Sequence, residues 1–343
     1  MRRVDVSLVG FGVVGKGLAR LLLTRREWLQ EQRGLDMRLV SVASARSGCI
    51  YAEDGLDIAG LLALAEQRRP LTELAHTRYF SSTLAGIEAL KSDILVEATG
   101  TNLRDGEPGL SHIRAALSRG QHVVTANKGP VALAGLELLQ LARQNGVQLR
   151  MESTVMAGTP VLSTALEGMA GAQIITTRGI VNGTTNYILS AMAEGRDYAE
   201  VLADAQARGY AEADPTADVE GYDAVAKAMI LSTLLFQQPL GAEQVARTGI
   251  TGVTREQVQH ASEVGKRIKL IASVRRMSGG EVEARVEPVA LPLSDPLAHV
   301  VGAMNALTLE SETLSSVTVI GPGAGSIETG QGLLADILAI AGI

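Results

Sequence analysis

The sequence predicts an α/β protein with two domains, of which the first is built on a doubly wound parallel sheet. Three observations lead to this prediction. At 343 residues the chain is long for a single domain. A glycine-rich loop directly follows a short apolar strand near the N-terminus, and strands then alternate with helices to about residue 150. Beyond that point strands and helices follow in mixed order, which predicts a second domain of α+β type.

The first expected strand covers residues 4–9 and runs into a loop that reads Gly10-Phe11-Gly12-Val13-Val14-Gly15, before a helical pattern at 18–23. Strand, glycine loop and helix in this order are the context of the Rossmann dinucleotide-binding fingerprint. Its glycines let a pyrophosphate approach backbone N–H groups at a helix N-terminus. We interpret the loop as a nicotinamide-cofactor site; a tight turn without a ligand is the alternative.

The second expected strand, residues 37–44, bears on the choice between NAD and NADP. An enzyme selective for NAD usually carries an acid at the end of this strand, where it accepts from the ribose 2′-OH. Asp36 precedes the strand and so lies at its opposite end. Ser44-Ala-Arg46-Ser47 instead offers a cation and two hydroxyl groups, which suit a 2′-phosphate. This favours NADP; the alternative is that Arg46 is a solvated loop residue.

Three further strands complete the first domain. They are expected at 93–100, 121–128 and 147–152, with helices at 109–119 and 130–145. In such sheets, ligands bind beyond the carboxyl ends of the strands. Thr99, Gly100 and Lys128 fall at these ends, so Lys128 can reach the reactive end of the cofactor. A solvated surface lysine is the other reading.

The second domain is expected to be a mixture of helices and strands. The helices are at 160–167, 254–262 and 295–302, and the strands at 173–181, 267–274, 281–290, 304–311 and 315–320. A last apolar helix is expected at 326–341.

An acidic segment precedes a helix that is apolar nearly all round. Its carboxylates are Glu212, Asp214, Asp218, Glu220 and Asp223, and the helix, residues 222–236, contains Lys227. Asp223 and Lys227 are four residues apart and project from one face. If buried, each needs a partner. Two readings stay open: a structural ion pair, or a polar pocket at the cofactor's edge. In such a pocket, carboxylates would hold a substrate ammonium, and the lysine would exchange a proton with a substrate oxygen.

The composition argues against several other classes of protein. A net charge of −6 and an aromatic content of 3% argue against a nucleic-acid surface, and no apolar run reaches the roughly 18 residues of a membrane span. The single cysteine, Cys49, excludes an internal disulfide and fits a reducing cytoplasm. The five histidines are scattered, which makes zinc an unexpected ligand.

Several motifs together resemble the homoserine dehydrogenase family over essentially the whole chain. They are the glycine loop at 10–15, Ala126-Asn127-Lys128, Asn182-Gly183-Thr184, the segment 209–227, and Gly321-Pro-Gly323-Ala-Gly325. The resemblance implies reversible NAD(P)-dependent hydride transfer between L-homoserine and L-aspartate 4-semialdehyde, a step of threonine, methionine and isoleucine biosynthesis.

The resemblance also implies roles for particular residues. Glu212, Asp223, Gly183 and Thr184 would bind the substrate, Glu212 through its amino group. Lys227 would donate the proton to the carbonyl oxygen in reduction, with Lys128 as a competing candidate. Thr99, Gly183 and Gly323 match positions that line the cofactor. A monovalent cation, expected to be sodium, would lie at Glu152, Val155, Ala157 and Thr159, although Met156-Ala157-Gly158-Thr159 departs from the usual Gly-Gly pair.

At the level of domains, the resemblance implies that residues 1–151 and 321–343 bind the dinucleotide and that residues 152–320 bind the substrate and form a homodimer. It also suggests a short form without a C-terminal regulatory domain, with weak or absent inhibition by threonine. Two alternatives remain: a dehydrogenase of another amino acid such as aspartate, which would not need the Lys227 constellation, and a non-catalytic nicotinamide-sensing protein. The acidic composition gives no sign of the basic helix-turn-helix that a DNA-binding sensor would need.

Overall fold

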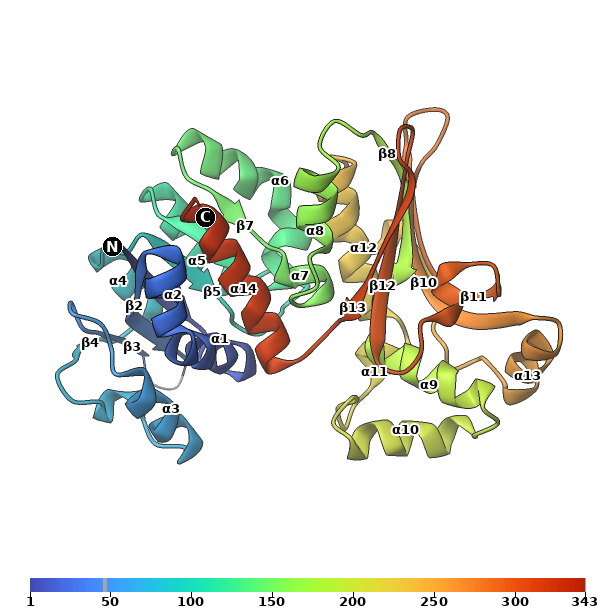
Figure 1. Cartoon of the computed structure of the whole chain (residues 1–343), viewed down its shortest axis with the longest axis horizontal. Helices are drawn as coiled ribbons and strands as arrows, with labels where there is room; N and C mark the ends of the chain where they lie inside the picture. Colours follow the sequence, from blue (N-terminus) through green and yellow to red (C-terminus); the bar gives the residue numbers. More distant parts are fainter. Residues whose placement is uncertain (46–47, 343) are drawn as a thin grey trace. The chain divides into compact units, whose positions relative to one another are not determined.

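The computed structural model describes residues 1–45 and 48–342, which form two compact units (Figure 1). Unit 1 comprises Met1–Gly158 and Gly325–Ile343, and unit 2 comprises Thr159–Ala324. The chain therefore passes between the units after Gly158 and Ala324, whereas the sequence-based division was drawn after Met151 and Ile320. No helix in the described part of the chain is both long and apolar enough to cross a bilayer.

The sheet of unit 1 confirms the predicted α/β class. Its strands lie in the order β4-β3-β2-β1-β5-β6-β7. Five of them run parallel: β1 (Arg2–Val9), β2 (Leu35–Ser44), β5 (Ile94–Glu97), β6 (His122–Thr125) and β7 (Leu149–Arg150). β3 (Gly48–Tyr51) and β4 (Arg78–Phe80) add an antiparallel edge. The sequence analysis missed this edge because strands of four and three residues are too short to show periodicity.

Eight α-helices and one short 3₁₀ helix belong to the described part of unit 1. They are α1 (Val13–Thr24), α2 (Arg26–Arg33), α3 (Ile58–Glu66), η1 (Leu71–Glu73), α4 (Thr83–Ala89), α5 (Gly109–Ser118), α6 (Lys128–Gln144), α7 (Ser153–Met156) and α14 (Ser326–Ile340). The expected strand at 147–152 is only two residues long, because α7 begins directly after it.

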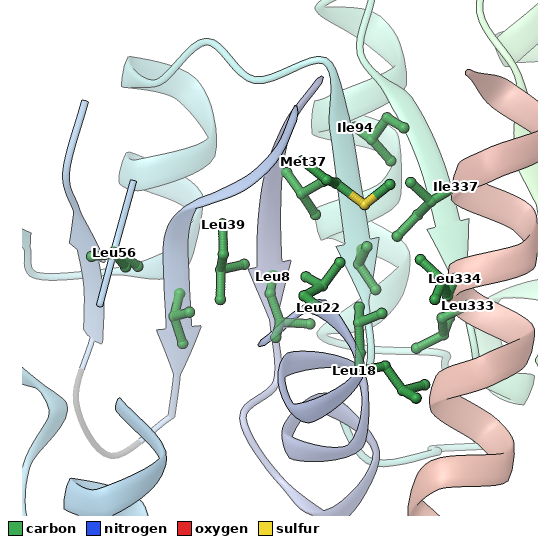
Figure 2. Close-up of a cluster of buried hydrophobic side chains, with 14 of the residues drawn as sticks. Leu8, Leu18, Leu22, Met37, Leu39, Leu56, Ile94, Leu333, Leu334 and Ile337 are labelled. Carbon is green, nitrogen blue, oxygen red and sulfur yellow. The ribbon is translucent and has the colours of Figure 1, made fainter. Parts of the chain in front are cut away.

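The core of unit 1 is closed by the last helix of the chain. Figure 2 shows Leu18 and Leu22 of α1 beside Leu333 and Ile337 of α14, next to the strands. The two helices touch backbone to backbone: a Cβ at Gly17 would lie 1.9 Å from the Ser326 carbonyl oxygen. The two ends of the chain also meet, since Arg2 Nη1 donates to the Ala341 carbonyl at 2.7 Å.

Unit 2 is built on a mostly antiparallel sheet in the order β13-β12-β8-β10-β11-β9, in which only β9 and β11 pair in parallel. Its strands are β8 (Ile174–Ile180), β9 (Val245–Arg247), β10 (Lys266–Arg276), β11 (Val282–Pro292), β12 (Met304–Ser311) and β13 (Ser315–Pro322). Its helices are α8 (Val161–Ser163), the π-helical η2 (Thr164–Gly168), α9 (Gly183–Ala193), α10 (Tyr198–Ala207), α11 (Thr216–Val219), α12 (Tyr222–Leu235), η3 (Ala242–Gln244), α13 (Arg255–Glu263) and η4 (Pro296–His299).

One expectation for unit 2 was wrong. The helix expected at 295–302 is a single 3₁₀ turn, because the Val300 carbonyl is used by side chains of Asn186 and Lys269 instead of by a helix. The acidic segment contains one helical turn, α11. The helix after it is buried as predicted: α12 packs on β10 and β11 and has a continuous buried run from Ala224 to Leu234.

The close approach of α1 and α14 predicts that Gly330→Ala destabilises unit 1. The new Cβ would lie 2.7 Å from the Leu18 nitrogen, so the helices must move apart. Overpacking of this kind costs about 1–3 kcal/mol, or a fall in Tm of roughly 2–10 °C. The control is Gly279→Ala, where a Cβ meets open space. A variant at Gly330 that melts with the wild-type protein would contradict this packing argument.

Candidate active site

The glycine loop lies over the ends of three parallel strands of unit 1. The Gly10 N–H donates to the Ala43 carbonyl of β2 at 2.8 Å, and a Cβ on Gly10 would lie 2.4 Å from the Ala98 carbonyl oxygen beyond β5. Gly10 also has a φ of +97°. A Cβ on Gly15 would lie 2.1 Å from the Gly10 oxygen. Both positions therefore require glycine, and the loop is held against the sheet.

The start of α1 has the features of a phosphate site. Gly12 is the N-cap residue, and a Cβ there would meet no atom of the described residues within 4 Å. The first backbone bond inside the helix is that of Lys16 N–H to Gly12 O at 3.0 Å, so the amides of Val13, Val14 and Gly15 precede the ladder. With open space at Gly12 and no acid in the first turn, these residues fit the pyrophosphate of a dinucleotide.

The end of β2 lies beside this loop through the Gly10–Ala43 bond. Asp36 is the second residue of β2 and its carboxylate accepts from Gln30 Nε2 at 3.2 Å, so it lies at the far end of the strand, as predicted. Arg46, the residue expected to meet a 2′-phosphate, lies outside the described residues, as does Ser47.

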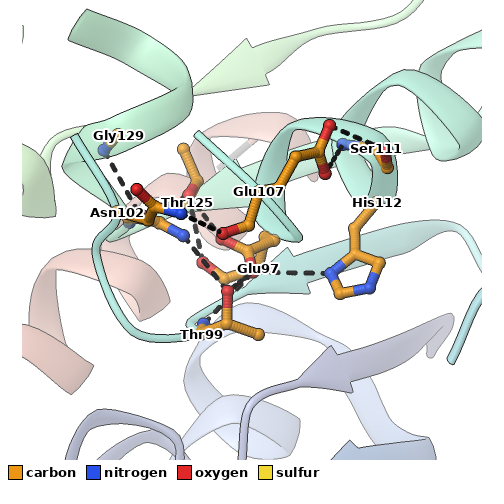
Figure 3. A network of polar contacts seen from close by, with 9 residues as sticks. Glu97, Thr99, Asn102, Glu107, Ser111, His112, Thr125 and Gly129 are labelled. Atoms are coloured by element: carbon orange, nitrogen blue, oxygen red, sulfur yellow. Dashed lines mark hydrogen bonds and ion pairs between the residues drawn. The ribbon is translucent and has the colours of Figure 1, made fainter. Parts of the chain in front are cut away.

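The ends of β5 and β6 are joined by a network of polar side chains (Figure 3). Thr99 Oγ1 donates to the fully buried carboxylate of Glu97 and accepts from Asn127 Nδ2 at 3.1 Å. Asn127 Oδ1 accepts from the Gly129 N–H at 3.1 Å and so caps α6, whose first residue is Lys128. The Asn127 side chain thus connects Thr99, after β5, to the start of α6, where Lys128 lies. Gly100, next to Thr99, is exposed.

The sequence analysis assigned no role to Glu97 or Asn127. The sequence did offer a signal for Glu97, which is an acid at the end of the apolar run Ile-Leu-Val-Glu. A carboxylate in a buried strand is rare unless it has hydrogen-bond or charge partners.

In unit 2 the structure brings Asp223 and Lys227 together. The Lys227 ammonium lies 2.9 Å from the Asp223 carboxylate and also donates to the Val181 carbonyl. Lys227 is 5% exposed, whereas the Asp223 side chain is 19% exposed. Asn182 Nδ2 donates to Asp223 at 3.1 Å and to Asp218 at 2.7 Å. A buried cation is therefore paired with a carboxylate that still has access to solvent.

The residues at the start of α9 lie beside this pair. Asn182 caps the helix, since its Oδ1 accepts from the Thr185 N–H at 2.9 Å. Thr184 Oγ1 donates to the Tyr210 carbonyl at 2.6 Å and holds the segment that precedes Glu212. Glu212 itself is exposed. The structure thus connects Gly183 and Thr184 to the Asp223 cluster through Asn182, and leaves Glu212 on the adjoining loop.

Four of the five clustered carboxylates have hydrogen-bond or ion-pair partners in the local fold. Asp223 and Asp218 share Asn182. Asp214 accepts from the Thr216 N–H at 3.1 Å at the start of α11, and Glu220 accepts from Thr251 Oγ1 at 2.7 Å and pairs with Arg247 at 3.5 Å. The density of negative charge therefore has a structural explanation for these four.

Gly323 packs on a buried amide. A Cβ there would lie 1.9 Å from Asn305 Nδ2, so packing alone requires glycine at this position. Asn305 is fully buried, and neither polar atom of its amide has a hydrogen-bond partner among the described residues. The sequence analysis missed Asn305, which is an unremarkable residue of a strand when read alone.

The segment assigned to a cation consists of the short helix α7 and the turns on either side of it. Glu152 is buried and its N–H donates to Asp336 at 2.9 Å; Val155 lies within α7, and Ala157 has a φ of +50°. Thr159, the first residue of unit 2, donates to the Pro322 carbonyl at 2.9 Å. The described His, Cys, Asp and Glu side chains form no group of three that could hold a metal, a finding that does not concern backbone oxygens.

The sequence is similar to known protein families and to proteins of known activity. Two family models match it: one described as homoserine dehydrogenase over residues 160–338, and one described as homoserine dehydrogenase, NAD binding domain, over residues 10–152. An NAD(+)-dependent homoserine dehydrogenase of Pseudomonas canavaninivorans is 42% identical over 99% of this chain and 97% of the relative.

Solved structures agree with these matches. A putative homoserine dehydrogenase of Archaeoglobus fulgidus is similar with a TM-score of 0.87 at 36% identity, over 98% of this chain and 99% of that one. A hyperthermophilic archaeal homoserine dehydrogenase in complex with NADPH gives a TM-score of 0.84 at 30% identity, over 99% and 98%.

Burial of Asp218 predicts a pH-dependent gain in stability for Asp218→Asn. Desolvation raises the pKa of Asp218 above 3.8, the nearby charge of Asp223 adds to this, and the Asn182 bond opposes it. A raised carboxyl pKa contributes stability that is present below the unfolded pKa and lost as pH rises through the folded one. The neutral amide should therefore raise Tm at pH 7, and the gain should vanish near pH 4.

Asp214→Asn is the control of opposite sign, because hydrogen bonds from Thr216 lower the pKa of Asp214. Its Tm at pH 7 should fall. An Asp218→Asn protein less stable than wild type at pH 7 would show that the charge of Asp218 is favourable in the fold.

Proposed function

This chain belongs to the homoserine dehydrogenase family, and from that premise we propose that unit 1 holds the cofactor and unit 2 the substrate. The enzyme is an NAD(P)-dependent oxidoreductase that acts on a CH–OH group and interconverts L-homoserine and L-aspartate 4-semialdehyde. The observation that carries the proposed division is the buried Lys227, paired with Asp223 and connected to the start of α9 by Asn182.

The proposed cofactor residues come from three strand ends of unit 1. The loop 10–15 holds the pyrophosphate at the N-terminus of α1, and Thr99, Gly100 and Lys128 lie towards the nicotinamide. From the family resemblance we also assign Gly323 to the cofactor. When bound, the nicotinamide donates or accepts the hydride. We propose NADP as the preferred form, because the sequence has no Asp or Glu from Ser44 to Ala52, where a ribose 2′-OH would need an acceptor.

Two related proteins support opposite choices of cofactor. The Pseudomonas relative is by name NAD(+)-dependent, and the archaeal neighbour was solved with NADPH. The choice in this chain therefore depends on its own residues around Ser44 and Arg46.

With aspartate 4-semialdehyde as substrate, the purified protein should oxidise NADPH with a higher kcat/KM than NADH. Arg46→Ala should lower kcat/KM for NADPH by roughly tenfold, the value of one charge-assisted contact, and leave NADH unchanged. Arg26→Ala, a basic residue at the start of α2, is the control. Equal loss with both cofactors would remove Arg46 from 2′-phosphate recognition. Oxidation of neither cofactor by the wild-type protein would contradict the catalytic assignment.

In the reductive direction, C4 of the semialdehyde receives the hydride and its oxygen receives a proton. We assign that proton to Lys227, with Asp223 as the carboxylate that orients it and contacts the substrate. Glu212 would bind the substrate ammonium, beside Gly183 and Thr184. The ion pair fixes the position of the ammonium group, which general acid catalysis requires. Lys128 is the second candidate for the same proton transfer.

Substitution of Lys227 separates the catalytic from the structural reading of the ion pair. Lys227→Ala should reduce kcat at least 10²-fold, the usual range for loss of a general acid, and leave cofactor affinity near normal. Asp223 keeps its bond to Asn182 in this variant, so the protein should fold. Lys266→Ala, at the exposed start of β10, is the control. A variant that unfolds would indicate a structural pair, and one that turns over normally would leave Lys128 as the proton donor.

Other parts of the proposal come from the family resemblance. They are a homodimer formed by unit 2, a monovalent cation, expected to be sodium, at Glu152, Val155, Ala157 and Thr159, and a cytoplasmic location. The buried Glu152 carboxylate is the feature that supports a cation. A monomer mass at sedimentation equilibrium would contradict the dimer, and rates that are unchanged after removal of Na⁺ and K⁺ would contradict the cation.

A further inference from the structure

Glu97 is a carboxylate for which the proposed function has no use, although it is buried at the end of a strand in unit 1. It is 0% exposed. Among the described residues, its only oppositely chargeable neighbour within 4 Å is His112, whose Nδ1 lies 3.7 Å from Oε1. A buried carboxylate without compensation costs several kcal/mol, so its surroundings have to stabilise it.

The other partners of the Glu97 carboxylate are Thr99, the N-terminal end of α5, and Thr125, whose Oγ1 lies 3.5 Å from Oε2. The Thr99 N–H donates to Glu97 Oε1 at 3.2 Å, and the Thr99 hydroxyl donates to the same oxygen. On the other side, a Cβ on Gly109, the first residue of α5, would lie 3.1 Å from Oε2. The positive end of the α5 dipole thus faces the carboxylate. Figure 3 shows Glu97 between Thr99 and His112.

The carboxylate determines the direction of the next hydrogen bond. The Thr99 hydroxyl donates to Glu97 Oε1, so the lone pairs of Thr99 Oγ1 are left for another donor. Asn127 Nδ2 fills that place at 3.1 Å. With its nitrogen turned to Thr99, the Asn127 amide presents Oδ1 to the Gly129 N–H at 3.1 Å, which is the cap of α6.

A second connection ties the same strand ends at the level of the backbone. Thr125 Oγ1 donates to the Glu97 carbonyl at 3.0 Å and accepts from the Asn127 N–H at 3.0 Å. Lys128 follows Asn127 as the first residue of α6. The position of Lys128 therefore depends on a relay that begins at Glu97.

We propose that Glu97 is a positioning residue of the reaction, which acts through the Thr99 hydroxyl and the Asn127 amide to fix the first turn of α6 and with it Lys128. The inference rests on the proposed role of Lys128 at the reacting end of the cofactor. A carboxylate that served stability alone would affect melting and leave turnover of the folded enzyme unchanged.

The test is a double-mutant cycle on the relay in the full-length enzyme. Glu97→Gln weakens the acceptor, and Thr99→Val removes the hydroxyl at constant shape. Each should lower kcat about tenfold, because a bond to a charged acceptor is replaced or lost. Two residues of one relay are not independent, so the double variant should lose no more than about the larger single loss. Thr99→Ser, which keeps the hydroxyl, should stay within about threefold of wild type.

Two readouts other than turnover accompany the cycle: the NADPH dissociation constant from fluorescence titration, and Tm. For Glu97→Gln both should stay close to wild type while kcat falls; Thr99 also lies at the proposed cofactor site, so for the Thr99 variants only Tm is expected to stay unchanged. Glu107→Gln is the matched control, since this carboxylate of the same unit accepts from the Ser111 N–H and hydroxyl and lies outside the relay. It should leave kcat unchanged.

The proposal is overturned if folded Glu97→Gln and Thr99→Val enzymes keep the wild-type kcat, or if their losses multiply in the double variant. It is also overturned if Thr99→Ser fails as badly as Thr99→Val. Lys128→Met distinguishes this failure from that of the proposed function. If Lys128→Met keeps full turnover, the role of Lys128 is wrong; if it loses turnover while the relay variants do not, the role of Glu97 is wrong.

Discussion

The arrangement of the proposed substrate residues depends on the side-chain amide of Asn182. Its nitrogen donates to Asp218 and Asp223, and its oxygen accepts from Thr185. One side chain thereby joins the starts of α9 and α12 to α11. A buried ion pair is stable only when the remaining lone pairs of its carboxylate are satisfied, and Asn182 supplies that bond to Asp223 beside Lys227. Without the amide, Asp223 and Asp218 would face one another with less compensation.

Unit 1 uses the same device at a different junction. Asn127 ends the connection from β6, caps α6 through Oδ1 and uses its nitrogen to reach Thr99 on the neighbouring strand end. In both units an asparagine at a strand-to-helix junction bonds sideways to a polar group and forwards to the helix. In both units the asparagine is also linked to a lysine that we assign to the chemistry. Lys128 is the next residue after Asn127, and Lys227 pairs with Asp223, which accepts from Asn182. Short amides with both a donor and an acceptor are suited to this double task.

The acidic segment shows how stability and function share one stretch of chain. Asp214 begins α11, Glu220 holds the loop at Thr251, and Asp218 shares the amide with Asp223. These contacts hold the backbone of the segment that carries the exposed Glu212. Burial raises the pKa of Asp218, so this arrangement keeps a carboxyl group in a place that disfavours its charge. Groups whose pKa is shifted by burial cost stability, and they occur most often at functional sites.

Much of the fold and some of the site followed from the sequence alone. The glycine loop, the parallel strands, the apolar helix α12 and the Asp223–Lys227 pair are local patterns, set by spacings of two to four residues. The antiparallel edge β3–β4 was not predicted because its strands are short, and the network around Glu97 was not predicted because its partners are set by the fold. Lys269 is another residue whose surroundings are set by the fold. It lies in a strand yet is 2% exposed, bonded to Asn186, Ser190 and the Val300 carbonyl, and burial lowers its pKa to about 8.

Nothing local marks such a lysine as buried, just as nothing near Gly17 indicates that Gly330 will pack against it. The sequence determined which segments form strands and helices and which family they belong to, because periodicity and motifs are properties of neighbouring residues. Only the tertiary structure decided which polar groups are enclosed and what partners they have, because those partners lie outside the local pattern: Asn186, the partner of Lys269, is 83 residues away along the chain.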